Sequence, residues 1–490
     1  MEQIINTGIA NTLAGNDTII GTKEITTDTP PQNRFSSIFN SGTLNTADGN
    51  DIITGTILGI EGSEEYYGIF NSGTLNTADG NDIITGINEN ETFSTFNLAN
   101  SGIYSEGGTI DTGDGNDIIT GISKKGFGIQ NHGSSINTGD GNDTIAGTSL
   151  VYGGILLFGP CSIDTGKGDD IITASSFGGG LIASYGIFLN TGEGNDIISG
   201  NSSTNGWGIF SNIPIDTGDG NDIIVGTSAN LDDSDGIANV RVGIGNASSI
   251  NTGNGDAIIT GIASPSNLGS YGISNDGTIN TGNGDAIISG IGSNYGILNQ
   301  GTINTGNSKD SLISQGSFFN SGGVFLGDGD DSIAVDTGFP NTADTGFPDT
   351  ADTDFPDTAF KNWNIIETGE GNDTITSAGV IYNEGTINTG NGEDSIITDG
   401  GFQSGSSGIV FLEEGEDYIK GFGSGIFNGG GDQDILELTS GSYTVEISGT
   451  AVNFTKDSTT MQTSEFEKLL AGYTTYDFTS LTAGQIIDVA

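Results

Sequence analysis

One aspartate recurs along this chain at a fixed place in the phrase [N/D]-T-G-x-G-N-D-x-I-x-G. The phrase occurs in 16 copies, of which 14 carry the aspartate and the other two have Ala257 and Ala286 there. Between Asp117 and Asp222 the copies follow one another every 26 or 27 residues. Because a carboxylate is a hard anionic ligand, such a series of carboxylates between glycines is typical of a site for hard cations.

The electrostatics of stacked copies also call for a cation. Carboxylates one coil apart repel by roughly 3 kcal/mol per neighbouring pair at an effective dielectric of about 20. Summed over about a dozen pairs, this exceeds the ~5–15 kcal/mol stability of an ordinary domain. The alternative is a metal-free arrangement in which the aspartates form solvated Asx turns with their carboxylates splayed into water.

The segment Thr112–Thr120, T-G-D-G-N-D-I-I-T, resembles the nonapeptide G-G-x-G-x-D-x-U-x of the RTX (repeats-in-toxin, haemolysin-type) calcium-binding family. Thr112 stands where the family has its first glycine, and Gly429–Glu437 keeps the double glycine but has Asp432 at the fourth place. The resemblance implies Ca²⁺ as cofactor, held by glycine carbonyls and by the aspartate of a stacked turn. It assigns the metal-binding role to Asp51, Asp82, Asp117, Asp143, Asp170, Asp196, Asp222, Asp331, Asp373, Asp394, Asp417 and Asp434.

The chain departs from the family in the spacing of its motifs. RTX nonapeptides run in tandem, two per coil, whereas here one copy stands in each stretch of mostly 21–35 residues. Calcium would then occupy one edge of the coils, and the number and completeness of the sites stay open. We expect the copies with Ala257 and Ala286 to bind calcium poorly or not at all.

A second phrase, G-I-x-N-x-G-T-[I/L], lies between the motifs and predicts strand, turn and strand. Repeats of this size bury an apolar face only by stacking. We therefore predict an all-β fold, a parallel β-solenoid of the β-helix or β-roll type, with a short C-terminal β-rich cap. The eighth motif position should point inward and form a core column of Ile119, Ile145, Ile172, Ile198, Ile224 and Ile375.

The organisation follows from where the motif stops. Residues 1–335 are predicted to be an N-terminal solenoid, and residues 361–437 continue it. Residues 336–360 are a low-complexity insertion of three octads, whose Phe-Pro steps exclude a central strand. Tandem duplication without function is the preferred explanation for the octads, although Phe339, Phe347 and Phe355 leave a binding role open. Residues 438–490 lack the motif and are predicted to be a cap, with a short helical patch at 464–470.

Two outward columns are expected beside the core. The seventh position should expose a stripe of Ile52, Ile83, Ile118, Ile171, Ile197, Ile223, Ile258 and Ile287. Such a stripe indicates an assembly face, unless the segments between the motifs fold back and cover it. The ninth position supplies a threonine array of Thr54, Thr85, Thr120, Thr173, Thr260, Thr376 and Thr398, which raises ice or surface binding as an alternative.

Composition narrows the classes of partner. The 490 residues include 11 Lys and Arg against 63 Asp and Glu, a net charge of −52, which excludes nucleic acid and disfavours anionic membranes. Cys161 is the single cysteine, so no intramolecular disulfide can form. No apolar run is long enough for a membrane span. Self-assembly and contact with a cell surface or polysaccharide stay open as further partnerships.

No catalytic site is expected. The runner-up reading is a solenoid polysaccharide lyase or epimerase, but such chemistry needs a base and cationic groups. Lys124 and Lys125 are the only adjacent basic pair, and His132 has no evident Ser, Cys or second His partner. Trp207 and Trp363 are more in keeping with packing than with sugar stacking.

The tail suggests a route out of the cell. No N-terminal signal peptide is visible, and residues 438–490 look like the C-terminal region of RTX proteins exported by type I secretion. A structural cap explains the same segment equally well. We expect an extracellular or cell-surface calcium-binding repeat protein, with a structural, surface or adhesive role, that folds on binding Ca²⁺.

Overall fold

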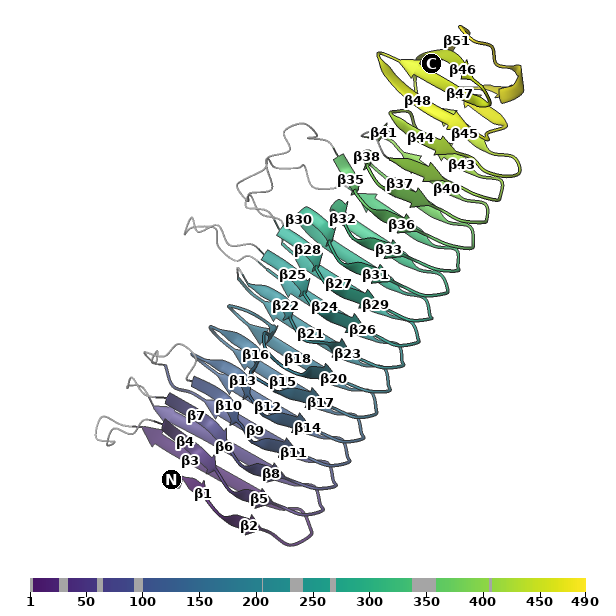
Figure 1. Cartoon of the computed structure of the whole chain (residues 1–490). Helices are drawn as coiled ribbons and strands as arrows, with labels where there is room; N and C mark the ends of the chain where they lie inside the picture. Colours follow the sequence, from purple (N-terminus) through teal and green to yellow (C-terminus); the bar gives the residue numbers. More distant parts are fainter. Residues whose placement is uncertain are drawn as a thin grey trace. The chain divides into compact units, whose positions relative to one another are not determined.

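A computed structural model describes residues 3–25, 34–59, 65–91, 100–204, 206–229, 241–264, 270–336, 358–404 and 408–490. The protein is an all-β parallel β-solenoid, which confirms the predicted fold class (Figure 1). It divides into two compact units, Met1–Ser264 and Pro265–Ala490. Within the described residues no helix is long and apolar enough to cross a membrane. Most of the octad insertion, with Phe339, Phe347 and Phe355, lies outside the described residues.

Each coil of the first unit contributes three strands, and a new coil starts directly after the motif aspartate. The first strands are β3 (Thr18–Ile25), β6 (Ile52–Gly59), β9 (Ile83–Asn88), β12 (Ile118–Ser123), β15 (Thr144–Ser149), β18 (Ile171–Ser176), β21 (Ile197–Ser202), β24 (Ile223–Ser228) and β27 (Ile258–Ala263). The second strands are β1 (Ile4–Asn6), β4 (Arg34–Asn40), β7 (Glu65–Asn71), β10 (Asn100–Glu106), β13 (Phe127–His132), β16 (Gly153–Phe158), β19 (Leu181–Ala183), β22 (Trp207–Ser211) and β25 (Arg241–Asn246). The short third strands are β2 (Ile9–Asn11), β5 (Thr43–Asn45), β8 (Thr74–Asn76), β11 (Thr109–Asp111), β14 (Ser135–Asn137), β17 (Ser162–Asp164), β20 (Phe188–Asn190), β23 (Ile215–Asp216) and β26 (Ser249–Asn251).

The second unit repeats this plan. Its first strands are β30 (Ile287–Asn299) and β32 (Ser311–Asn320), which run on into the place of the second strand, then β34 (Ser332–Asp336), β37 (Thr374–Ser377), β40 (Ser395–Thr398), β43 (Tyr418–Lys420) and β45 (Ile435–Leu438). The second strands are β28 (Ser270–Asn275), β35 (Thr358–Asn362), β38 (Val380–Asn383) and β41 (Phe402–Gln403). The third strands are β29 (Thr278–Asn280), β31 (Thr302–Asn304), β33 (Gly323–Phe325), β36 (Ile365–Glu367), β39 (Thr386–Asn388), β42 (Ile409–Phe411) and β44 (Gly425–Asn428).

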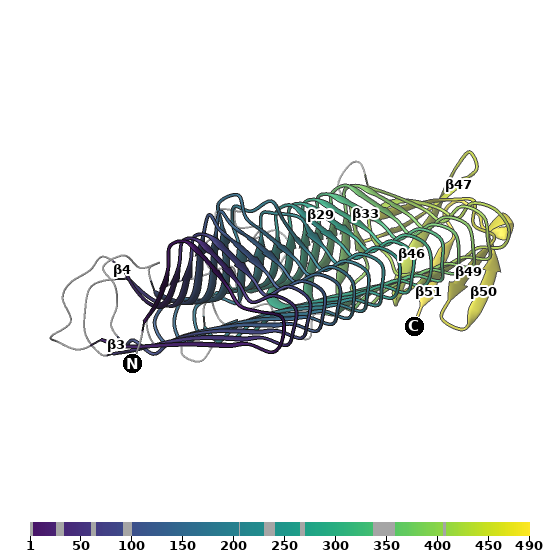
Figure 2. The ribbon, with the colours of Figure 1, turned by 90° about the horizontal axis from the view of Figure 1, so that it is seen from below.

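Parallel pairing holds equivalent residues of successive coils in register, so each motif position becomes a column (Figure 2). The eighth-position isoleucines line the interior as predicted; Ile119, Ile145 and Ile172 are completely buried. Two glycines let the first and second strands of a coil meet: a Cβ on Gly121 would lie 2.2 Å from the carbonyl oxygen of Gly128. Since real Cβ atoms do not approach so closely, only glycine fits there.

The asparagine of the second phrase forms a buried column that the sequence analysis assigned to a turn. The Nδ2 of Asn40 donates to the Oδ1 of Asn71 at 2.8 Å, and in the second unit Asn299 donates to Asn320 at the same distance. These asparagines are fully buried. Each such bond stabilises by about 1 kcal/mol, and the pairing satisfies amides that would otherwise be stranded in the interior.

The C-terminal residues end the parallel stack. Strands β48 (Thr459–Ser464) and β49 (Lys468–Ala471) pair in parallel with β44 and β45, in the place of one more coil. Their outer partners run antiparallel: β47 (Ala451–Lys456) with β48, β46 (Gly441–Ser448) with β47, β51 (Ile486–Val489) with β46, and β50 (Thr474–Asp477) with β49, followed by the 3₁₀ turn η1 (Phe478–Ser480). The helical patch predicted at 464–470 is wrong. Hydrogen bonding to the edge of β45 outweighs the weak helix propensity of so short a segment.

Replacing one core isoleucine tests the column arrangement. Ile172→Ala should lower the free energy of unfolding by about 2–5 kcal/mol, since it leaves a cavity in a fully buried column. Ile171→Ala is the matched control, because that neighbouring side chain points outward and is 37% exposed. Urea unfolding of both variants measures the difference, and equal losses would contradict the inward assignment of position eight.

Candidate calcium-binding turns

The motif turn is built mainly on glycines with positive φ, although Ala47, Ala78 and Ser308 take their place in single coils. In the turn between β11 and β12, Gly113 has φ +78° and Gly115 φ +151°, which is left-handed backbone. A Cβ on Gly115 would lie 1.6 Å from the carbonyl oxygen of Gly80, the equivalent glycine of the preceding coil. The turns therefore stack closely, and the carbonyl oxygens of their glycines lie one above another along the same edge.

The motif aspartate at the end of each turn points inward and is buried. Asp117 is completely inaccessible, and its Oδ1 accepts the backbone N–H of Asp82 in the preceding coil at 2.7 Å. The same bond, 2.7–3.0 Å long, recurs along both units, where the accepting residues are Asp51, Asp82, Asp117, Asp143, Asp170, Asp196, Asp222, Asp310, Asp331, Asp373, Asp394, Asp417 and Asp434. One carboxylate oxygen per coil thus holds the next coil in register.

The other carboxylate oxygen is left without a partner. Among the described residues, a buried Oδ2 atom makes no hydrogen bond in Asp51, Asp82, Asp117, Asp143, Asp170, Asp196, Asp310, Asp331, Asp373, Asp394, Asp417 and Asp434. Asp222 differs, since its Oδ2 accepts the hydroxyl of Thr217 at 2.6 Å. In several other coils the equivalent threonine turns to a carbonyl of the following coil, as Thr305 does to Leu326 at 2.9 Å. Twelve stacked anionic oxygens are therefore unsatisfied.

Burial shifts the protonation of these groups. For Asp170, desolvation is the largest cause and raises the pKa, the nearby Thr165 hydroxyl and the N–H of Asp143 lower it only in part, and neighbouring carboxylates raise it further. The pKa rises from 3.8 to about 6 for Asp143, Asp222 and Asp310, to about 7 for Asp117, Asp170, Asp196, Asp394 and Asp434, and to about 8 for Asp331 and Asp417. Without a cation, the column therefore favours protons over free carboxylates.

The ligand atoms at this edge are of the type that Ca²⁺ prefers. The unsatisfied oxygens are hard and anionic, and glycine carbonyl oxygens stack at the same edge. No three His, Cys, Asp or Glu side chains converge within the described part of the chain into a cluster able to hold a metal ion. A bound Ca²⁺, which takes about six to eight oxygen ligands, would therefore draw on main-chain carbonyls as well as on carboxylates.

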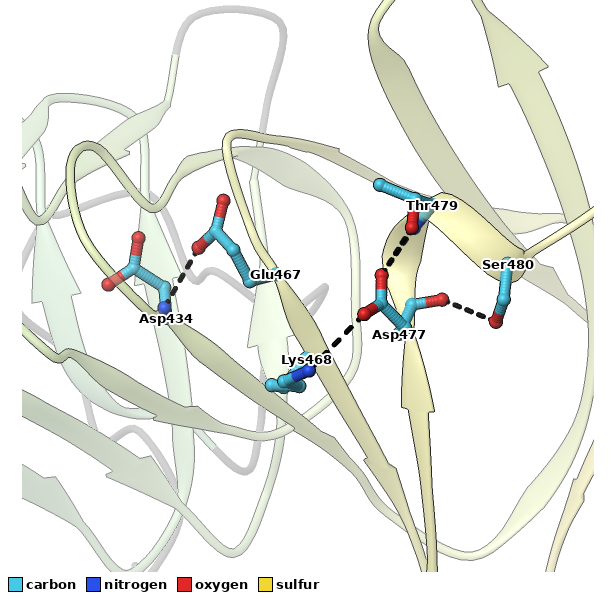
Figure 3. A network of polar contacts seen from close by, with 6 residues as sticks. All are labelled: Asp434, Glu467, Lys468, Asp477, Thr479 and Ser480. Atoms are coloured by element: carbon cyan, nitrogen blue, oxygen red, sulfur yellow. Dashed lines mark hydrogen bonds and ion pairs between the residues drawn. The ribbon is translucent and has the colours of Figure 1, made fainter.

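Two members of the buried carboxylate column were not among the metal ligands expected from the sequence: Asp310, which was counted as a motif copy, and Glu467, which was not. Asp310 belongs to an irregular copy, T-G-N-S-K-D, yet it is buried and accepts the N–H of Ala286 at 2.7 Å. Glu467, directly before β49, is the last acceptor of this column: its Oε2 accepts the N–H of Asp434 at 3.0 Å (Figure 3). The irregular copy was a usable signal for Asp310, whereas nothing in the sequence around Glu467 resembles the motif.

The two alanine copies and the terminal aspartate differ from the other turns. Ala257 and Ala286 are buried in the aspartate's place and bring no carboxylate. The preceding residues, Asp256 and Asp285, are exposed and lie outside the buried column. Asp17 in the first coil is only partly buried, and its Oδ2 accepts the hydroxyl of Thr12 at 2.5 Å.

Residues considered for catalysis lie in packing roles. His132 lies between Tyr104 and Phe158, with ring centroids 6.4 and 5.3 Å away, and its Nδ1 is 3.2 Å from the Tyr104 hydroxyl. Lys124 pairs with Glu89 at 2.9 Å and Glu91 at 3.2 Å. Trp207 packs on Phe210, and Trp363, 47% exposed, meets Phe319 edge-on.

Comparison with known proteins gives one likeness to report. No protein-family model matches the chain, and no curated protein matches it. Among solved structures, it is similar to a hyperactive, Ca²⁺-dependent, β-helical antifreeze protein from an Antarctic bacterium. The identity is 16%, the match covers 82% of this chain and 84% of that one, and the TM-score is 0.36.

The raised pKa values predict how pH affects the metal-free protein. The folded aspartates hold protons more tightly than unfolded ones, so their stabilisation is complete below about pH 4 and is lost as pH rises through 6–8. In EDTA, the free energy of unfolding should fall over this window, by on the order of 1 kcal/mol per pKa unit and residue. Urea unfolding in EDTA from pH 4 upward measures it, and loss of the β spectrum before urea is added marks the pH at which the metal-free chain no longer folds.

High salt provides the control for this measurement, because it screens surface repulsion but not the buried column. A pH dependence that vanishes at about 0.5 M NaCl would assign the effect to the surface charge and contradict this account.

Proposed function

We propose that this chain is a secreted calcium-binding repeat protein of the RTX type, with a structural, surface or adhesive role, and that its solenoid folds on binding Ca²⁺. The observation that carries the proposal is the column of twelve buried Oδ2 atoms without a hydrogen-bond partner. An unpaired buried carboxylate is strongly unfavourable, and an oxygen-seeking cation relieves both desolvation and mutual repulsion. The net charge of −52 acts in the same direction.

The proposed ligands of each ion are the motif aspartate, through its Oδ2, and glycine carbonyl oxygens of the stacked turns. Asp51, Asp82, Asp117, Asp143, Asp170, Asp196, Asp331, Asp373, Asp394, Asp417 and Asp434 keep this role from the sequence analysis, and Asp310 joins them. Asp222 ranks lower, because its Oδ2 is already bonded to Thr217.

We propose a non-enzymatic role. A lyase or epimerase acting on acidic sugars needs cationic groups around its base. Within the described residues, His132 stacks between aromatic rings and Lys124 is neutralised by two glutamates, so neither supports that chemistry.

Calcium-dependent folding is tested with one buried aspartate and its neighbour. Far-UV circular dichroism should lose its β spectrum in EDTA at low salt and neutral pH, and regain it with excess Ca²⁺. Asp170→Asn should lower the calcium-bound melting temperature and remove about one ion in calorimetric titration, because it takes a charged oxygen from a hard-cation site.

Asp169→Asn is the matched control. It removes the same formal charge from the exposed neighbour, at a place where other turns have Asn116 or Asn142. This variant should leave calcium binding nearly unchanged. In a metal-free solenoid the result would reverse, since Asp170→Asn would then relieve buried repulsion and raise the melting temperature.

We propose extracellular or cell-surface localisation through type I secretion. Deleting residues 438–490 would not isolate a signal, because β48 and β49 also complete the last coil. Fusing these residues to the C-terminus of a cytoplasmic passenger should carry it into the medium of cells that have a type I exporter. Retention of the fusion, while the full chain is exported, would leave the segment as a cap only.

A further inference from the structure

The first unit has a flat sheet face that carries no charge. It consists of the first three outward side chains of nine first strands, β3 to β27, which lie side by side in Figure 1; the next outward residue of β3, Glu24, lies at its border. We call it the uncharged face: Thr18, Ile20, Thr22, Ile52, Thr54, Thr56, Ile83, Thr85, Ile87, Ile118, Thr120, Ile122, Thr144, Ala146, Thr148, Ile171, Thr173, Ser175, Ile197, Ser199, Asn201, Ile223, Val225, Thr227, Ile258, Thr260 and Ile262. At the chain's 15% charged content, about four of these 27 would be charged.

The uncharged face is open to solvent. Its seventh-position column includes Ile52, Ile118 and Ile258, whose exposed fractions are 39%, 40% and 38%. Parallel pairing places equivalent residues of neighbouring strands in register, about 4.8 Å apart. The threonine column runs beside it at position nine. An exposed apolar stripe of this regularity marks an interaction surface rather than scattered surface residues.

Charges border the uncharged face on both sides. On the turn side, the exposed residues Asp114, Asp140 and Asp219 follow the ends of the third strands. On the opposite side, Lys124 pairs with Glu89 and Glu91 just beyond the end of β12. In a chain with a net charge of −52, this face is where another acidic surface can approach without bringing carboxylates together.

We propose that the uncharged face is a self-association surface through which two copies of this chain pack face to face. The two surfaces carry the same strand repeat, so the ridges of one copy fit the grooves of the other along their whole length. Nine strands, each with three side chains on the face that span a length of about five residues, cover roughly 700 Å² per copy. This is close to the about 800 Å² per partner of a stable protein interface.

The arrangement is two-fold symmetric, because the same patch is used on both copies. Within the second unit, the ninth-position column ends in two charged residues, Lys420 and Glu437. Charges at these places would be buried without compensation in a face-to-face contact. Because each copy uses the same patch, the contact is satisfied within a pair and leads to a closed dimer rather than a filament.

Sedimentation velocity on the full chain in saturating Ca²⁺ tests the proposal. The wild type should pass from monomer to dimer over about two decades of concentration. Thr120→Glu with Thr173→Glu places like charges on β12 and β18 and should raise the dissociation constant about tenfold or more. The control pair, Thr43→Glu with Thr109→Glu, lies two coils apart on the third strands β5 and β11, outside the uncharged face, and should leave the dissociation constant unchanged.

Charge reversal keeps the test independent of folding. Thr120→Lys with Thr173→Lys should also be monomeric, and mixing it with the glutamate pair should restore a dimer. The circular dichroism spectrum and calcium stoichiometry of every variant should match the wild type. A wild type that stays monomeric, a glutamate pair that dimerises normally, or a mixture without recovery overturns the proposal. So does adsorption of monomeric wild type to ice or a neutral polysaccharide that the glutamate pair abolishes.

Discussion

Each coil of this solenoid buries one carboxylate, and most of its other features follow from that burial. One oxygen of the aspartate accepts the N–H of the preceding coil, as Asp170 does from Asp143 at 2.8 Å, and thereby sets the register. The other oxygen faces the turn without a partner. An interior that stacks negative charge at every repeat is stable only if the charge is neutralised, by protons as the raised pKa values indicate or by a cation. Because glycines bring carbonyl oxygens to the same edge, a cation would gain additional ligands there that a proton would not use.

Register, once set, spreads to the rest of the coil. The asparagine of the second strand lies a nearly constant distance before the motif aspartate: Asn71 precedes Asp82 by 11 residues and Asn131 precedes Asp143 by 12. This block contains the third strand and the turn, so its length is held by hydrogen bonds at both ends. Variation in coil length falls instead between the first and second strands. A longer connection there adds little entropy cost.

The sequence was sufficient for the fold class and for the inward isoleucines, because both depend on a pattern repeated in every coil. The sequence did not predict the role of residues whose hydrogen-bond partner lies in the neighbouring coil. The asparagine column was assigned to a turn, since an Asn before Gly is a common turn signal and only stacking reveals the amide pairing. Thr398 was placed in the outward array, but it is buried and Ile397 takes the outward place. Glu467 lies in a segment without the motif. It accepts the N–H of Asp434, which has no further motif aspartate after it, and this need is visible only in the folded stack.

The buried aspartate column and the uncharged face both bear on electrostatic repulsion, the first between coils and the second between copies of the chain. A solenoid with this charge would repel both its own coils and other copies of itself. The proposed calcium ions neutralise the repulsion along the interior edge, where carboxylates of successive coils are closest. On the outside, the first strands keep three positions in each coil free of charge and place their carboxylates at the borders. Ion binding therefore governs whether coils stack, and the composition of the outer face governs what the stacked coils can contact. Both properties follow from residues one to five places apart in the same repeat, as Asp117, Ile118, Thr120 and Ile122 are, so each duplicated repeat extends the proposed metal column and the outer face together.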